Sequence, residues 1–268
     1  MALAITTNYL KIMANFELIW SHPWLMAIAL NTFLIIIALI VPKKLLTVMG
    51  YLHAWLLGVI VWGCLQWQGY LIVMFYFLVG SSITKVGMAQ KEAEGIAEKR
   101  SGVRGPENVW GSALIGTICA IAFYFAPEFW QPFWLLGYTA SFATKLSDTC
   151  ASEIGKAYGK NTFLITTLKP VPRGTEGAIS LEGTLAGIVA SIAIALLAWG
   201  LGMINLVGVI ICILSAFIAT NLESLVGATV QNQFDWLTNE VVNIINTFLG
   251  ALIAIALSYT MITYLSLI

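Results

Sequence analysis

The sequence predicts an all-α fold: a polytopic integral membrane helix bundle of about eight transmembrane helices, forming one membrane domain over residues 1–268. First, the chain is 59% hydrophobic and only 10% charged, whereas soluble domains carry about 25% charged residues. Second, apolar segments of about 20 residues, long enough to cross a bilayer, recur along its length. Third, nearly all charged residues lie in three polar loops. The zero net charge excludes a general attraction to nucleic acid.

The predicted spans are bounded by polar or proline-containing segments. They cover residues 24–41, 44–65, 68–84, 109–127, 131–147, 181–203, 205–222 and 241–267. All seven prolines fall at or beyond the ends of these spans, and proline is disfavoured inside helices. Residues 1–20 contain Lys11 and Glu17 among apolar neighbours, so we expect an interfacial helix there rather than a ninth span. This segment has neither a basic stretch nor a small-residue cleavage site, so we expect no signal peptide.

The three polar loops, 85–108, 148–180 and 223–240, fall on one face of the membrane when the spans are threaded in order. Of the 13 Lys and Arg residues, only Lys11 lies on the opposite face. The positive-inside rule therefore places the loops in the cytoplasm. Most of the 13 acidic residues lie there too, which that rule does not require. Either long loops simply carry the polar residues or the loops form an active site, and the types of residue favour the active site.

The first two polar loops begin with the same short motif. The pattern Ser-x-x-Thr-Lys occupies residues 81–85 and again residues 141–145. Both copies lie where a helix reaches the polar face, so Thr84 and Thr144, each followed by a lysine, are brought to the same membrane depth. The repeat is either a trace of duplication or chance.

One face of the fifth predicted helix carries oxygen-bearing side chains. Thr144, Asp148 and Ser152 are spaced four residues apart and share a helix face. An adjoining stripe of small residues follows: Ala151, Gly155 and Gly159. An ionised carboxylate close to the membrane needs a strong reason, and Mg²⁺, which binds one or two carboxylates together with substrate phosphates, is one. The alternative is a salt bridge from Asp148 to Lys145 or to a loop arginine.

The segment from Lys169 to Ser180 has the composition of a phosphate-binding turn. Lys169 and Arg173 supply positive charge and directional donors, and the glycines at 174 and 177 let the backbone approach a ligand closely. A predicted helix begins directly afterwards, and a helix N-terminus offers free N–H groups to phosphate. The pattern is not a Walker A loop, because GxxxxGK[ST] is absent. The alternative is an ordinary turn that starts a helix, with Ser180 as its N-cap.

The third polar segment leads into the last helix with a row of amides. Asn239, Asn243 and Asn246 lie on one face of that helix, where they either bind neighbouring helices or line the opening of a site. The only histidines, His22 and His53, are far from the loops in sequence, so a reaction that needs histidine as general base is disfavoured. The four cysteines form no CxxC pair, which argues against a disulfide framework or a zinc site.

Taken together, the motifs resemble a known family. Asp148-x-x-Ala-x-x-x-Gly155-x-x-x-Gly159-Lys160, followed by Lys169 and Gly174-Thr-x-Gly-x-x-Ser180, is similar to the nucleotide-site pattern of CTP-dependent polyprenol kinases. The first loop and the segment 223–231 indicate one branch, the phytyl-phosphate kinases, which are integral membrane proteins. The resemblance covers roughly residues 70–250.

The resemblance implies a reaction and a set of roles. CTP, or another nucleoside triphosphate, gives its γ-phosphoryl group to phytyl monophosphate, with Mg²⁺ as cofactor, and forms phytyl diphosphate for tocopherol and prenylquinone synthesis. Its plant and cyanobacterial members act in phytol salvage, so a cyanobacterial chain would lie in the plasma or thylakoid membrane. The implied catalytic residues are Lys85, Arg104, Asp148 and Lys169, with Asp148 and Glu153 as metal ligands. The implied substrate-binding residues are Ser81, Thr84, Lys91, Arg100, Asn108, Thr144, Lys145, Glu223, Gln231 and Asn243. The implied nucleotide-binding residues are Gly155, Lys156, Gly159, Lys160, Arg173, Gly174, Thr175, Gly177 and Ser180.

Two other functions stay open at this point. One is a related enzyme on the same scaffold, either a kinase of another isoprenoid alcohol or phosphate or a cytidylyltransferase. The other is a secondary transporter of an anionic solute. Transporters usually keep ionisable residues near the bilayer midplane, at broken helices, whereas here the charges gather at one surface.

Overall fold

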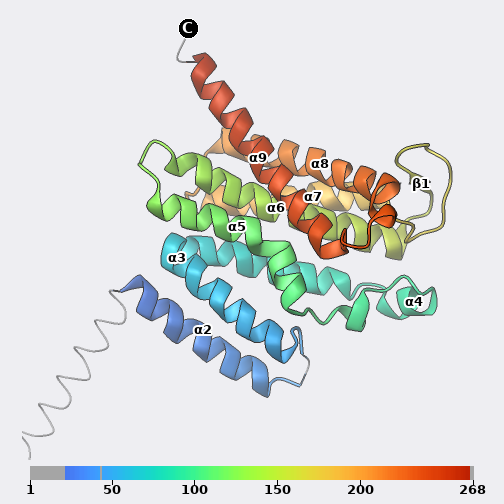
Figure 1. Ribbon diagram of the computed structural model, residues 1–268, viewed down its shortest axis with the longest axis horizontal. Helices are drawn as coiled ribbons and strands as arrows, with labels where there is room; N and C mark the ends of the chain where they lie inside the picture. Colours follow the sequence, from blue (N-terminus) through green and yellow to red (C-terminus); the bar gives the residue numbers. More distant parts are fainter. Residues whose placement is uncertain (1–21, 43, 266–268) are drawn as a thin grey trace, which may run out of the picture.

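The computed structural model describes residues 22–42 and 44–265 as a bundle of long helices (Figure 1). The helices are α2 (Pro23–Ile40), α3 (Val48–Thr84), α4 (Met88–Ala93), α5 (Pro106–Phe125), α6 (Gln131–Tyr158), α7 (Leu181–Gly200), α8 (Leu206–Thr229) and α9 (Asn239–Leu265). Two short strands, β1 (Thr162–Leu164) and β2 (Ala178–Ser180), pair antiparallel. The predicted interfacial segment 1–20, and Lys43, lie outside the described residues. Within those residues, six helices are long and apolar enough to cross a membrane, so the predicted polytopic membrane fold is confirmed.

The second and third predicted spans are the two arms of α3. At Gln66 the backbone leaves helical geometry, with φ 54° and ψ −154°, and the chain turns back on itself (Figure 1). The rings of Trp62 and Tyr70, on opposite sides of the turn, lie 5.2 Å apart. The arms 48–65 and 67–84 therefore form an antiparallel helical hairpin, in agreement with the two spans predicted from the sequence.

The centre of the bundle is α6, which packs against α3, α5, α7, α8 and α9. It is not among the six apolar helices, because its second half carries polar side chains that face other helices instead of lipid. Tyr138, Phe142 and Leu146 are fully buried along it. The helix continues eleven residues beyond the predicted end at 147, as far as Tyr158, and no proline interrupts this stretch. Residues 148–158 are therefore helix rather than loop, and α8 likewise continues to Thr229.

The polar segments gather at one end of the bundle. Leu46 pairs with Arg104 through backbone hydrogen bonds, and Arg173 donates to Glu94 at 2.6 Å, so the turns after α2, α3 and α6 lie together. Figure 1 shows α4 and β1 at this end, opposite the α5–α6 connection. The other end is aromatic: the rings of Trp130 and Tyr259 stack at 5.8 Å.

Candidate active site

A polar cavity of about 410 Å³ opens at the loop end of the bundle. Its walls come from α3, α5, α6, α7, α8, α9, the first polar loop and residues 174–180, so residues from all three predicted loops meet in one place. The predicted site residues that line it are Thr84, Arg100, Arg104, Asn108, Lys145, Asp148, Glu153, Gly155, Lys156, Gly174, Thr175, Gly177, Ser180, Glu223 and Asn243.

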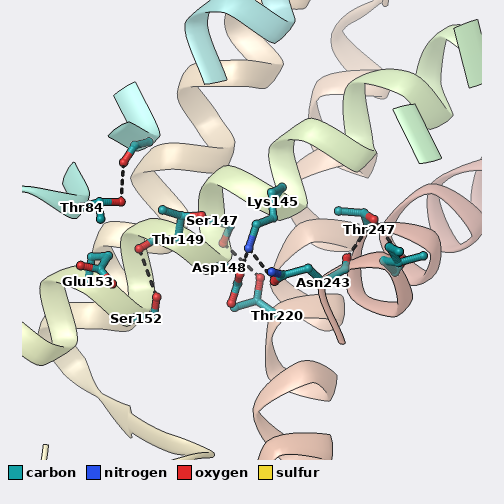
Figure 2. Close-up of polar contacts among 12 residues, drawn as sticks. Thr84, Lys145, Ser147, Asp148, Thr149, Ser152, Glu153, Thr220, Asn243 and Thr247 are labelled. Atoms are coloured by element: carbon teal, nitrogen blue, oxygen red, sulfur yellow. Dashed lines mark hydrogen bonds and ion pairs between the residues drawn. The ribbon is translucent and has the colours of Figure 1, made fainter. Parts of the chain in front are cut away.

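Lys145 links α6 and α9 inside the cavity. Its Nζ donates to Oδ2 of Asp148 and to Oδ1 of Asn243, each at 2.6 Å, and Figure 2 shows Lys145 between the two. Asp148 and Lys145 are only 8% and 6% exposed. The salt bridge that the sequence left as an alternative is therefore present. It occupies one carboxylate oxygen of Asp148 and leaves the other for a ligand.

Glu223 supplies a second carboxylate to the cavity from α8. It lines the same space as Asp148 and lies close enough to Asp148 and Lys145 for direct electrostatic interaction. The described residues contain no cluster of three or more His, Cys, Asp or Glu side chains suited to hold a metal. Mg²⁺ does not require one, because it binds one or two carboxylates and takes its remaining ligands from phosphates and water. The residues present therefore fit Mg²⁺ bound together with a phosphorylated substrate.

Glu153 has partners of its own. It forms an ion pair with Lys91, and both side chains are almost fully buried. Lys91 also donates to the carbonyl of Thr84 at 2.7 Å, and Nζ of Lys156 lies 3.5 Å from both Glu153 and Glu98. Burial lowers the pKa of the Lys156 ammonium, but Glu153 and Glu98 outweigh burial and raise it. The structure thus pairs a predicted metal ligand with a predicted substrate-binding lysine.

The predicted phosphate turn leads into the N-terminus of α7. Gly174 and Gly177 have φ of 81° and 75°, a left-handed conformation that glycine adopts without strain. Ser180 is the N-cap, and its Oγ accepts from the N–H of Gly183 at 3.1 Å. Residues 174–180 line the cavity together with Gly183 and Thr184, so the N-terminus of α7 lies at its wall.

The stripe of small residues on α6 packs against that same helix start. A Cβ at Gly155 would lie 3.3 Å from Oγ of Ser180, and a Cβ at Gly159 would lie 3.1 Å from the same oxygen. On α7, a Cβ at Gly183 would overlap the carbonyl of Ala151. These glycines therefore allow α6 and α7 to approach closely. Gly155 and Gly159 were both predicted to bind the nucleotide, but only Gly155 lines the cavity.

Two arginines of the first loop face the cavity. Arg100 forms an ion pair with Glu107 and donates to Asn108 at 2.9 Å. Arg104 donates to the hydroxyl of Tyr76 at 2.8 Å and stacks over that ring at 5.4 Å. In the part of the chain that the structure describes, no carboxylate pairs with Arg104.

Other predicted site residues do not line the cavity: Ser81, Lys85, Lys91, Thr144, Gly159, Lys160, Lys169, Arg173 and Gln231. Thr144 packs against Gly250 of α9. Arg173 donates to Glu94 and to the carbonyl of Ala157, and so ties the 165–177 connection to α4 and α6. Lys160 and Lys169 are exposed on the β1–β2 segment.

Among the residues of the cavity wall that sequence reasoning missed are Tyr76, Ser147 and Thr220. Tyr76 holds Arg104, and Ser147 and Thr220 share a hydrogen bond of 3.3 Å between α6 and α8. Each is a hydroxyl within an apolar span. The unusual density of hydroxyls near the polar end of these spans is the signal that could have identified them.

Comparisons with known proteins show the family to which the chain belongs. The sequence profile of the family described as "Integral membrane protein DUF92" matches residues 31–251. The uncharacterized membrane protein sll0875 of Synechocystis is 66% identical, over 90% of this chain and 93% of the relative. Protein VTE6, chloroplastic, of Arabidopsis thaliana is 46% identical, over 88% of this chain and 72% of the relative.

A third relative is more distant in sequence. The uncharacterized membrane protein MJ0933 of Methanocaldococcus jannaschii is 32% identical, over 84% of this chain and 92% of the relative. No solved structure matches significantly. The resemblance to the integral membrane family of phytyl-phosphate kinases is confirmed, and the chain belongs to the DUF92 integral membrane protein family.

Proposed function

We propose that this protein is a kinase that transfers the γ-phosphoryl group of CTP, or of another nucleoside triphosphate, to phytyl monophosphate. The observation that carries the proposal is the cavity at the polar end of the bundle, where carboxylates, cationic side chains and a helix N-terminus converge at the boundary of an apolar bundle. Family membership and 46% identity to protein VTE6, chloroplastic, support it. The positive-inside rule supports a cytoplasmic location of the cavity.

Phosphoryl transfer depends on positioning and charge neutralisation more than on covalent chemistry. An oxygen of the phytyl phosphate attacks the γ-phosphorus, the bond to the β-phosphate oxygen breaks, and the nucleoside diphosphate leaves. A phosphate monoester has a second pKa of about 6 and is largely a dianion near neutral pH. No side chain therefore needs to take a proton, which is consistent with a cavity wall without histidine.

Each reactant has residues suited to hold it. Asp148 and Glu223 would hold Mg²⁺, which neutralises charge on the β- and γ-phosphates when it is bound. Glu223 replaces Glu153 as the second carboxylate of the proposed Mg²⁺ site, because Glu153 forms an ion pair with Lys91. The turn at 174–177 and the start of α7 would bind nucleotide phosphates. Arg104 would bind the phosphate of the lipid, since guanidinium groups form strong paired hydrogen bonds with phosphate.

The experiment uses purified full-length protein in lipid nanodiscs. Phytyl monophosphate and Mg²⁺ are supplied with CTP, ATP, GTP or UTP in turn, and phytyl diphosphate is measured by mass spectrometry. The expected result is phytyl diphosphate together with the nucleoside diphosphate. Release of pyrophosphate would instead identify a cytidylyltransferase, and no product with any nucleotide from well-folded protein would overturn the proposal.

A further inference from the structure

A second, apolar cavity of about 340 Å³ lies between α2, the two arms of α3, and α5. Aliphatic and aromatic side chains form most of its wall, among them Leu34, Ala38, Ala54, Met74 and Phe77. We call this cavity the α2–α3 groove. Helix α2, which forms one of its walls, packs chiefly against α3. Only 11% of the residues of α2 are buried inside the bundle. The groove therefore lies at the edge of the bundle, beside the bilayer.

The α2–α3 groove and the polar cavity share part of their walls. Tyr76, Arg104, Asn108 and Ser112 line both spaces. These four residues carry polar side chains, and Arg104 is the one charged residue among the described residues that line the groove. Asn31 and Tyr70, which also line it, satisfy each other through a hydrogen bond. A ligand with an apolar body and a polar end can occupy both spaces at once only in one orientation, with its polar end at these residues.

The charge at this junction selects an anion. Arg104 is held by the hydroxyl of Tyr76 at 2.8 Å, and no carboxylate among residues 22–42 and 44–265 neutralises it. An uncompensated guanidinium beside an apolar space is costly unless an anion joins it. A phosphate attached to a hydrocarbon chain supplies both the anion and the apolar body.

The far end of the groove is closed by a polar contact. The hydroxyl of Tyr70 donates to Oδ1 of Asn31 at 2.9 Å, and both side chains are buried. Tyr70 and Tyr76 line the groove from the same arm of α3, six residues or about 9 Å apart along the helix axis. The groove therefore runs along the helix axes, from the Arg104 end toward the middle of the bundle.

We propose that the α2–α3 groove binds the prenyl chain of the lipid phosphate, with the phosphate at Arg104. This inference rests on the proposed function and adds to it the tail-binding subsite and the direction of the chain. The groove gives the hydrocarbon chain an apolar surrounding, and it accounts for how the phosphate reaches the γ-phosphorus while the chain stays among apolar side chains.

The test fills the groove without touching the polar cavity. Ala54→Phe adds a ring to the groove wall, and Ala38→Phe does the same from α2. Ala256→Phe, at an exposed position of α9, is the matched control. We expect kcat/KM for phytyl monophosphate to fall about tenfold or more in both groove variants, which corresponds to about 1.4 kcal/mol of lost binding. With dimethylallyl monophosphate, whose short chain fills much less of the groove, kcat/KM should fall much less.

A second measurement does not depend on turnover. A prenyl monophosphate with a diazirine at mid-chain is photolysed with wild-type protein, and the labelled peptides are mapped by mass spectrometry. Labels on the groove residues of α2 and α3 that phytyl monophosphate competes away would support the subsite. Labels on the outer faces of α8 and α9, or equal losses with long and short substrates in the groove variants, would overturn it. Wild-type protein that makes no diphosphate from either lipid would instead overturn the proposed kinase function.

Discussion

Lys91 and Glu153 form an ion pair that is almost completely buried, although 62 positions separate them in the chain. Lys91 comes from α4 in the first polar loop, and Glu153 comes from the end of α6. The pair therefore fixes the first loop against the central helix, beside the polar cavity that Glu153 lines.

Replacing one partner of this pair should destabilise the protein. Glu153→Gln leaves the Lys91 ammonium buried without its counter-charge, and such losses cost about 3–5 kcal/mol. The expected result is a clear fall in the midpoint of thermal unfolding in detergent. The double variant Lys91→Met with Glu153→Leu should recover most of it, because neither charge then remains. If Glu153→Gln instead unfolds at the wild-type temperature and needs more Mg²⁺ for turnover, Glu153 is a metal ligand and the prediction is wrong.

The two carboxylates of the cavity should control the metal requirement. Asp148→Asn and Glu223→Gln each remove a negative charge from the proposed Mg²⁺ site, and we expect turnover to fall by about two orders of magnitude or more. Turnover is measured over a series of Mg²⁺ concentrations, and chelation of the metal should abolish it in the wild type. Asp235→Asn, at an exposed loop position, is the control and should behave as the wild type. Normal turnover in Asp148→Asn would exclude the metal role.

Arg104 should govern the lipid substrate rather than the nucleotide. Arg104→Ala removes charge-assisted hydrogen bonds to the lipid phosphate, each worth about 1.5–3 kcal/mol, so the KM for phytyl monophosphate should rise by about 10- to 100-fold. The KM for CTP, measured in the same preparation, is the internal control and should stay unchanged. Arg104→Lys should recover part of the loss, because the charge remains but the paired donors do not. An effect confined to CTP would assign Arg104 to the nucleotide.

Two glycines with positive φ allow the cost of backbone strain to be measured separately from the cost of a steric clash. Gly177 has φ 75° and Gly95 has φ 70°, but a Cβ at Gly177 would overlap Ala228 of α8, while nothing lies within 4 Å of the corresponding position at Gly95. Gly95→Ala should cost about 1–2 kcal/mol of stability from backbone strain alone. Gly177→Ala should cost more and should also raise the KM for the nucleotide, because the turn at 174–180 has to move away from α8. Equal changes in stability and in the KM for the nucleotide in both variants would show that the turn at 174–180 does not bind the nucleotide.

The orientation of the polar end can be measured with single cysteines. The four native cysteines are all buried, so they should react little with a membrane-impermeant maleimide. Lys169→Cys, on the exposed β1–β2 segment, should be labelled only in inverted vesicles of a bacterial expression host. Glu128→Cys, at the exposed α5–α6 connection, should be labelled only in intact cells. The reverse pattern would place the cavity outside the cytoplasm.

The helices were predictable because their signal is local. Length, hydropathy and proline positions predicted each span, including the break near Gln66 that makes two arms of α3. The predicted end of α6 at residue 147 was wrong, because the polar residues that follow were taken to end the helix. They continue it instead, since α6 is surrounded by other helices rather than by lipid, and its polar face looks into a cavity.

The site was predictable only in part. The spacing of Thr144 and Asp148 placed them on one face, yet Asp148 lines the cavity while Thr144 packs against Gly250. A helix face is wide enough to meet two different neighbours, and only the tertiary packing decides between them. For the same reason, charge and spacing identified Lys91 and Glu153 as notable residues but could not reveal that they neutralise each other.

The shared wall at Tyr76 and Arg104 means that, in the proposed reaction, the two reactants arrive from different phases. The nucleotide diffuses through water in three dimensions, whereas the lipid moves within the plane of the bilayer. Saturation of the enzyme with the lipid substrate then depends on the mole fraction of that lipid in the membrane rather than on its bulk concentration. Diluting the lipid substrate with inert phospholipid at constant total substrate should slow the reaction. Adding buffer that contains the same nucleotide and Mg²⁺ concentrations should not.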